Sequence, residues 1–304
     1  MDSRTKALLW SGAYFLLILS LLTSLSLITA FLLIVPVIVL YNILSTKKFI
    51  FHIVPVLLIS GIINPLLLML ALYFVIPAIL MGRCYKRRAS ALRTIVVGAA
   101  TLLVEMLLLL FIGTLLFQFN LSEYVQDMLN VAIKPMQEVI ANSELSQYFV
   151  LSNEHMDRLM NMSVQRFPFA LIVSSFLLSI ITHAIARPIL GRMGYTTMSL
   201  KPVREWMFPR SLIWYYLFSF IIEIMVLNSE SGYLMMISAN LVPMLNTIFC
   251  IQAMAFFFFL AHHRKWRPIV PILLAILVFL FPPMAIIGIL DIAFPLRQMM
   301  TKPK

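Results

Sequence analysis

The sequence predicts an all-α fold, a polytopic bundle of transmembrane helices, and three observations carry this prediction. Hydrophobic residues make up 62% of the chain, charged residues only 12%, and the mean hydropathy is +0.99. Several apolar runs reach or exceed the roughly 20 residues that a helix needs to cross a bilayer. The basic residues fall between these runs, as orientation signals do, so the net charge of +11 does not indicate a nucleic-acid surface.

The N-terminal part of the chain predicts five spans. The run 7–44 is nearly twice the length of a span, and its polar middle predicts two short spans with a turn near Thr23–Ser26. The run 49–82 contains Asn64-Pro65 and predicts a second hairpin, because proline interrupts helices. A fifth span is predicted over 94–117.

Residues 120–166 are the one long polar segment, and they predict amphipathic helices in an extracytoplasmic insert. Apolar residues recur at helical spacing after Asn120, which is the predicted N-cap. Pro135 predicts a kink or a split in this helix, and a second amphipathic helix is predicted over 152–166. Both helices would lie along the membrane surface or form a folded cap over the bundle.

Three more spans are predicted over 167–186, 211–227 and 233–261, which brings the firm spans to about eight. The last apolar run, 268–296, is interrupted by two prolines and predicts a C-terminal broken hairpin or a ninth span. The positive-inside bias favours the hairpin, which keeps the basic C-terminus on the side of the other basic loops. The chain, 1–304, is then a single integral membrane domain with its N-terminus in the cytoplasm.

Glu105 and Glu223 each stand inside a long apolar run, where an ionisable residue is costly and usually faces the interior of a bundle. Glu105 shares a helix face with Thr101, and Glu223 shares one with Ser219. One interpretation is a ligand or proton site, and the other is a packing seam with hydrogen-bonded carboxyl groups. Asn240 is a further ligand candidate, although buried amides commonly join helices.

Asp291 lies late in the last apolar run, six positions before Arg297, and this spacing predicts a structural ion pair. His183 is expected to reach the lipid headgroups. The sequence contains no catalytic motif, metal-ligand set or phosphate-binding loop, so we expect neither an enzyme nor a cofactor. Cys84 and Cys250 are too few and too far apart for a disulfide framework.

The layout of the chain, with Ile251-Gln252-Ala253 and a terminal Gly288-Ile289-Leu290-Asp291 followed by Arg297, resembles the YybS-type membrane protein family of Gram-positive bacteria. That family implies no biochemical activity, but it is distantly similar to the substrate-binding S components of energy-coupling-factor (ECF) transporters. The resemblance implies a helical bundle in the bacterial cytoplasmic membrane that holds a small molecule near its outer face. S components dock on a coupling subunit through a first-helix Ala-x-x-x-Ala pattern, and the Ser20-x-x-x-Ser24 found here departs from it.

The sequence leaves two functions open. The first is S-component-like small-molecule binding or transport, in which a coupling subunit with ATPases or an ion gradient would supply the energy. The second is a non-transporting scaffold or regulatory partner of another membrane protein, for which the resemblance suggests a membrane-bound cyclic-dinucleotide phosphodiesterase. The lipid bilayer surrounds the protein in both cases, the small-molecule ligand is unknown, and nucleic acid is not an expected partner.

Overall fold

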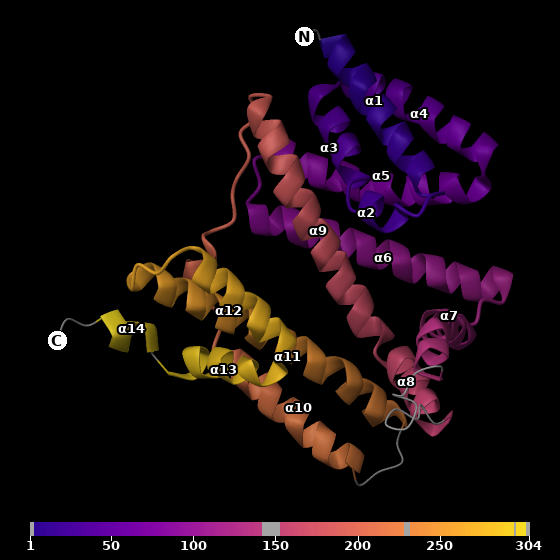
Figure 1. Ribbon diagram of the computed structural model, residues 1–304. Coiled ribbons are helices and arrows are strands. Elements are labelled where there is room, and N and C mark those ends of the chain that lie inside the picture. Colours follow the sequence, from indigo (N-terminus) through magenta and orange to yellow (C-terminus); the bar gives the residue numbers. More distant parts are fainter. Residues whose placement is uncertain (1–2, 142–152, 228–231, 295, 302–304) are drawn as a thin grey trace. The chain divides into compact units, whose positions relative to one another are not determined.

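Every regular element in residues 3–141, 153–227, 232–294 and 296–301, which this computed structural model describes, is a helix (Figure 1). The first helices are α1 (Ser3–Ser20), α2 (Ser26–Ala30), α3 (Ile34–Ile43), α4 (Thr46–Ile63), α5 (Pro65–Lys86) and α6 (Ala91–Phe117). The middle of the chain forms α7 (Leu121–Ala141), α8 (Asn153–Gln165) and α9 (Phe167–Arg192). The remainder forms η2 (Val203–Glu205), α10 (Ser211–Leu227), α11 (Gly232–His263), α12 (Ile269–Leu280), η3 (Pro282–Met284), α13 (Ala285–Ala293) and α14 (Leu296–Thr301).

The helices end where polar residues and prolines interrupt the apolar runs, as predicted. The turn expected near Thr23–Ser26 is confirmed, because α1 ends at Ser20 and α2 begins at Ser26. The hairpin between α4 and α5 turns at Asn64, whose Oδ1 accepts a hydrogen bond of 2.9 Å from the backbone N–H of Leu66. Pro65 then occupies the first helical position, where its missing N–H is harmless.

In the part of the chain that the structure describes, six helical segments are long and apolar enough to cross a membrane: 26–43, which comprises α2 and α3, 46–63, 65–86, 91–117, 167–192 and 232–263. Of the eight spans that the sequence predicts, the other two correspond to α1, which is 18 residues long, and α10, which is 17 residues long. Helix α10 is apolar but shorter than the others. The last run is broken as predicted, because the chain bends by 115° between α12 and the segment 282–293.

The chain divides into two compact units, which we describe separately. Unit 1 comprises 1–119 and 171–200, and unit 2 comprises 120–170 and 201–304. In unit 1, α3 packs against α1 and α5, and its residues 34–40 are all buried. The prediction of a single membrane domain over 1–304 stays a prediction.

Unit 2 is organised around α11, which packs against α10, α12 and α13 (Figure 1). Its core contains Leu245, Phe249 and Ala253 of α11, together with Val278 of α12 and Ile292 of α13. The break in the last apolar run therefore brings α13 back against α11, and this contact positions the polar cluster that is described below.

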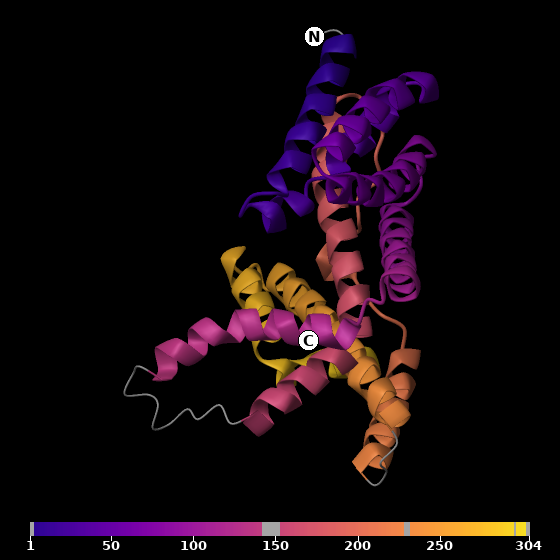
Figure 2. The same cartoon turned by 90° about the vertical axis from the view of Figure 1, so that its right-hand side faces the viewer.

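The polar segment forms the two helices that its amphipathic pattern predicts. Asn120 caps α7, because its Oδ1 accepts hydrogen bonds from the backbone N–H groups of Ser122 (3.0 Å) and Glu123 (3.4 Å). Figure 2 shows α7 and α8 as neighbouring helices, and they pack against each other. Helix α7 continues through Pro135, so a split at this proline is wrong, and the kink predicted as the alternative stays a prediction.

Candidate functional site

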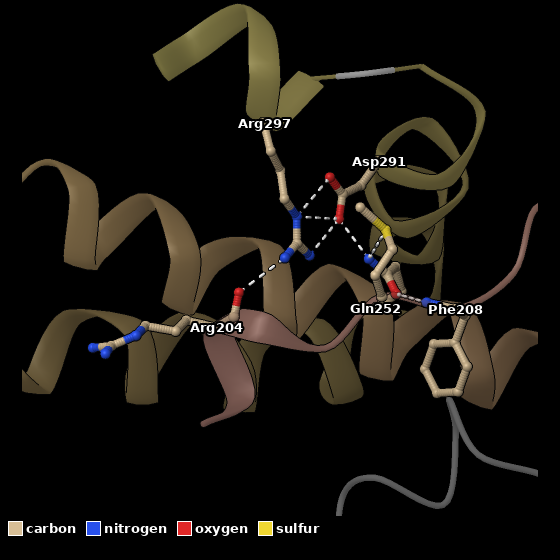
Figure 3. Close-up of polar contacts among 6 residues, drawn as sticks. Arg204, Phe208, Gln252, Asp291 and Arg297 are labelled. Carbon is tan, nitrogen blue, oxygen red and sulfur yellow. Dashed lines mark hydrogen bonds and ion pairs between the residues drawn. The ribbon is translucent and has the colours of Figure 1, made fainter. Parts of the chain in front are cut away.

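A buried ion pair lies at the C-terminal end of unit 2, between α13 and α14 (Figure 3). Asp291 is only 1% exposed. The guanidinium of Arg297 donates to it from Nη2 to Oδ2 at 2.7 Å, and from Nε to both carboxylate oxygens at 3.1 Å. A forked arrangement of this kind is the strongest geometry that arginine and a carboxylate adopt. The residues that the spacing of six predicts as a structural pair are thus in contact.

Gln252 of α11 completes this cluster and joins three segments of unit 2. Its Nε2 donates to Asp291 Oδ2 at 2.5 Å, and its Oε1 accepts from the backbone N–H of Phe208 at 3.0 Å. Arg297 Nη1 donates to the backbone carbonyl of Arg204 at 2.9 Å. The carboxylate, the amide and the guanidinium are therefore all engaged by groups of the same chain, which is what a buried polar cluster requires.

Gly288 allows this cluster to form, because it brings α13 against the backbone of α11. A Cβ atom at this position would collide with the backbone carbonyl oxygen of Phe249 and would lie 3.0 Å from the backbone nitrogen of Ala253. Asp291 follows Gly288 by three residues, and Gln252 follows Phe249 by three residues, so both polar side chains lie on the contacting faces. The two short motifs that carry the family resemblance thus meet at one helix contact.

Sequence reasoning did not predict Gln252 as a member of this cluster. The sequence feature that could have identified it is that Gln252 is the only amide in the otherwise apolar stretch 248–261. The backbone N–H of Phe208 and the backbone carbonyl of Arg204 also belong to the cluster. The sequence could not indicate them, because every residue type supplies a carbonyl and almost every one supplies an N–H.

Glu105 lies near the middle of α6, about 21 Å from its first residue and about 18 Å from its last. Both carboxylate oxygens are buried, and neither has a hydrogen-bond partner in the described residues. Tyr73 of α5 donates nearby, to the backbone carbonyl of Leu102 at 3.5 Å. Thr101, the predicted companion of Glu105, donates to the carbonyl of Val97 in its own helix at 2.7 Å. Glu105 is thus a buried polar group whose hydrogen-bonding capacity is not used.

Gly98 of α6 lies where this helix contacts α5 and α9. A Cβ atom at Gly98 would collide with Ser179 Oγ of α9 and would lie 2.6 Å from Met81 Sδ of α5. Ser179 Oγ also donates to the backbone carbonyl of Ile95 at 2.8 Å, so the close approach is tied by a hydrogen bond. Glycine at this position lets the three helices meet.

His183 does not reach the lipid headgroups, and that prediction is wrong. Its side chain is 4% exposed and stacks on Tyr85, with ring centroids 5.7 Å apart. His183 Nδ1 lies 2.7 Å from the hydroxyl of Tyr85, while Nε2 is buried without a partner in the described residues. The side chain of His183 packs against α5 and does not extend toward the headgroups. An apolar helix face can accommodate the ring of histidine in this way.

Glu223 differs from Glu105 in its surroundings. It is exposed on α10, and Ser219, one turn before it, is 1% exposed and donates to the carbonyl of Tyr216 at 2.7 Å. Glu105 belongs to unit 1 and Glu223 to unit 2.

Asn240 of α11 makes three hydrogen bonds, all of them to backbone groups. Its Oδ1 accepts from the N–H of Phe169 at 2.8 Å, and its Nδ2 donates to the carbonyls of Gln165 and Met236 at 2.7 Å each. These bonds hold the junction between α8 and α9 against α11. The described contacts of Asn240 are those of an amide that joins helices.

Comparisons with known proteins relate this chain to predicted membrane proteins. A family model described as "Predicted membrane protein (DUF2232)" matches residues 13–292. A protein of Bacillus subtilis (strain 168), described as "Uncharacterized protein YybS", is 27% identical over 252 residues, which cover 80% of this chain and 79% of that protein. No solved structure matches. The resemblance to the YybS-type family is thus confirmed, and the chain belongs to the DUF2232 family of predicted membrane proteins.

Proposed function

We propose that this membrane protein binds a small molecule or a proton at Glu105, as S-component-like binding or transport requires. One observation carries the proposal: a carboxylate in the middle of an apolar helix whose two buried oxygens lack partners among the described residues. An unsatisfied buried carboxylate is destabilising, and a cationic or hydrogen-bond-donating ligand, or a proton, removes that penalty. Ligand sites between the helices of a bundle are a common arrangement.

The topology that we propose places eight spans in the bacterial cytoplasmic membrane, with the N-terminus in the cytoplasm and residues 120–166 outside. The distribution of lysine and arginine supports this orientation. The amphipathic helices α7 and α8 support the assignment of an insert that lies on the membrane or caps the bundle. The 115° bend supports a C-terminal broken hairpin rather than a straight ninth span.

Native mass spectrometry of the protein, purified gently from its own host, tests the proposal and gives the mass of the ligand. We expect a small molecule at fixed stoichiometry, and co-purifying ATPases with a coupling subunit would identify an S component. The similarity to ECF S components stays a prediction until such subunits are found.

Replacing Glu105 by glutamine is expected to weaken retention of that ligand by at least about tenfold, since a hydrogen bond to a charged group contributes about 1.5–3 kcal/mol. The loss is measured as the dissociation constant of the ligand in detergent. Glu223→Gln is the matched control, because it makes the same change on an exposed helix face, and it should bind as the native protein does. Unchanged affinity in Glu105→Gln contradicts the assignment of the ligand to Glu105, and a purified protein that carries no small molecule excludes the small-molecule form of the proposal.

A second candidate function, that of a scaffold or regulatory partner for another membrane protein, is favoured by the position of Glu223. Its carboxylate is exposed on α10 among exposed apolar side chains, including Phe220 (52%), Ile221 (47%) and Met225 (51%). A charged group on an apolar face is costly in lipid, and a basic or hydrogen-bond-donating side chain of a partner helix would offset that cost.

Under this second function, Glu223→Leu is expected to reduce recovery of the partner by about tenfold in quantitative co-purification, because one charge-assisted hydrogen bond is lost. Phe220→Leu, on the same helix and also exposed, is the control and should leave recovery unchanged. Full recovery with Glu223→Leu would exclude this carboxylate from the contact.

A further inference from the structure

One end of unit 2 gathers basic side chains from segments that are far apart in the sequence. The segments 201–210, 262–267 and 291–297 contain seven lysine and arginine residues and two acidic residues. The structure joins them directly: Arg204 Nη1 lies 3.1 Å from His262 Nδ1, and Arg297 donates to the backbone of Arg204. The cluster is therefore assembled by the fold.

One of the two negative charges in this cluster is balanced by an ion pair. Asp291 is buried, and both of its oxygens accept hydrogen bonds from Arg297. Glu205 is the other carboxylate in these segments, and it is exposed. Arg210 and Arg264 are exposed as well, so the surface that solvent or lipid meets here carries an excess of positive charge.

A pocket of ≈ 200 Å³ opens beside Arg210 and Arg297, within unit 2. Its lining includes charged side chains, namely Arg210 and the Asp291–Arg297 pair, as well as apolar ones. The apolar lining is formed by Met207, Phe208, Ile292, Phe294 and Leu296. Met207 and Phe294 are 54% and 55% exposed, so the apolar wall continues onto the outer surface of the unit. A pocket lined by both an exposed arginine and apolar side chains matches the junction of a phosphate headgroup and an acyl chain.

Two tryptophans favour a position of this end of unit 2 at the level of the headgroups. Trp266 is 36% exposed and directly follows the last turn of α11, where Lys265 adopts a positive φ of 55°. Trp206 donates from Nε1 to the backbone carbonyl of Lys201 at 2.8 Å. Tryptophan is enriched at the boundary between headgroups and acyl chains, where one part of the ring is apolar and the N–H is polar.

We propose that this surface binds the phosphate headgroup of an anionic phospholipid, with Arg210 and Arg264 as the main electrostatic contacts. The excess of cationic groups selects for negative charge, and the apolar wall together with the interfacial tryptophans selects for a lipid over a soluble anion. Basic pockets between transmembrane helices recognise anionic headgroups in this way. The inference goes beyond the proposed ligand at Glu105, which lies in unit 1.

Native mass spectrometry of the full chain in nonionic detergent, supplied with phosphatidylglycerol or phosphatidylcholine, tests the proposal. We expect one phosphatidylglycerol molecule to stay bound and phosphatidylcholine to dissociate. The double variant Arg210→Gln/Arg264→Gln should bind phosphatidylglycerol about 25-fold more weakly, because each basic residue near an anionic headgroup contributes about fivefold. The conservative variant Arg210→Lys/Arg264→Lys should retain binding, which separates a loss of charge from a loss of folding.

A matched control removes two exposed arginines from unit 1, in Arg87→Gln/Arg93→Gln. This control should bind phosphatidylglycerol as the native protein does. An equal loss in the control would show that net charge, rather than this surface, retains the lipid and would overturn the proposal. Release of the bound lipid by millimolar inorganic phosphate would assign the surface to a soluble anion and would overturn the commitment to a lipid.

Discussion

Replacing Gly288 by alanine is expected to destabilise the protein by about 2 kcal/mol. A helix-interior alanine is intrinsically favoured over glycine by about 1 kcal/mol, so propensity alone would stabilise α13. The added Cβ atom, however, collides with the backbone carbonyl oxygen of Phe249, and a backbone atom cannot rotate away as a side chain can. Overpacking costs about 1–3 kcal/mol, or more where the backbone must move, and this cost exceeds the gain in propensity. Thermal or denaturant unfolding in detergent measures the difference.

Gly12→Ala is the matched control for this prediction. Gly12 also lies in a helix interior, but a Cβ atom there would have nothing within 4 Å. The same chemical change should therefore stabilise the protein by up to about 1 kcal/mol. If Gly288→Ala and Gly12→Ala shift stability in the same direction, then α13 does not lie against the backbone of α11 as the structure shows.

The helical fold was largely predictable because its signals are local. The helix breaks at Thr23–Ser26 and at Asn64-Pro65 follow from the residues at these positions and do not depend on how the rest of the chain packs. Pro135 is the exception: α7 continues through it, since one lost backbone hydrogen bond does not end a helix when its neighbours remain bonded.

The candidate sites were less predictable, because they depend on which helix faces meet. The pairing of Asp291 with Arg297 spans six residues and can be inferred from spacing, whereas Gln252 reaches Asp291 from 39 residues away. Periodicity shows that a helix face is apolar, but it does not show which other helix packs against that face. The same limit explains His183, whose burial depends on the position of Tyr85 in another helix.

Replacing Arg297 by methionine is expected to destabilise the protein by about 3 kcal/mol. The substitution leaves the buried carboxylate of Asp291 with Gln252 as its remaining partner in Figure 3, and it removes the donor to the carbonyl of Arg204. Removing one member of a buried ion pair typically costs about 3–5 kcal/mol, because the other charge is left without compensation. Arg297→Lys should fall between the native protein and Arg297→Met, since lysine keeps the charge but cannot form the forked contact.

A double-mutant cycle with Asp291→Asn shows whether the loss comes from the pair itself. In Asp291→Asn/Arg297→Met no charge is left buried, and the introduced side-chain amide can still accept from the amide of Gln252. The double variant should therefore be more stable than the sum of the two single effects by at least about 1 kcal/mol. Additive effects would mean that Arg297 acts through Arg204 or through the ring of Phe259, whose centroid lies 5.2 Å from the guanidinium carbon. The cycle thus distinguishes an ion pair that holds α13 and α14 together from an arginine that only packs against α11 and the segment containing η2.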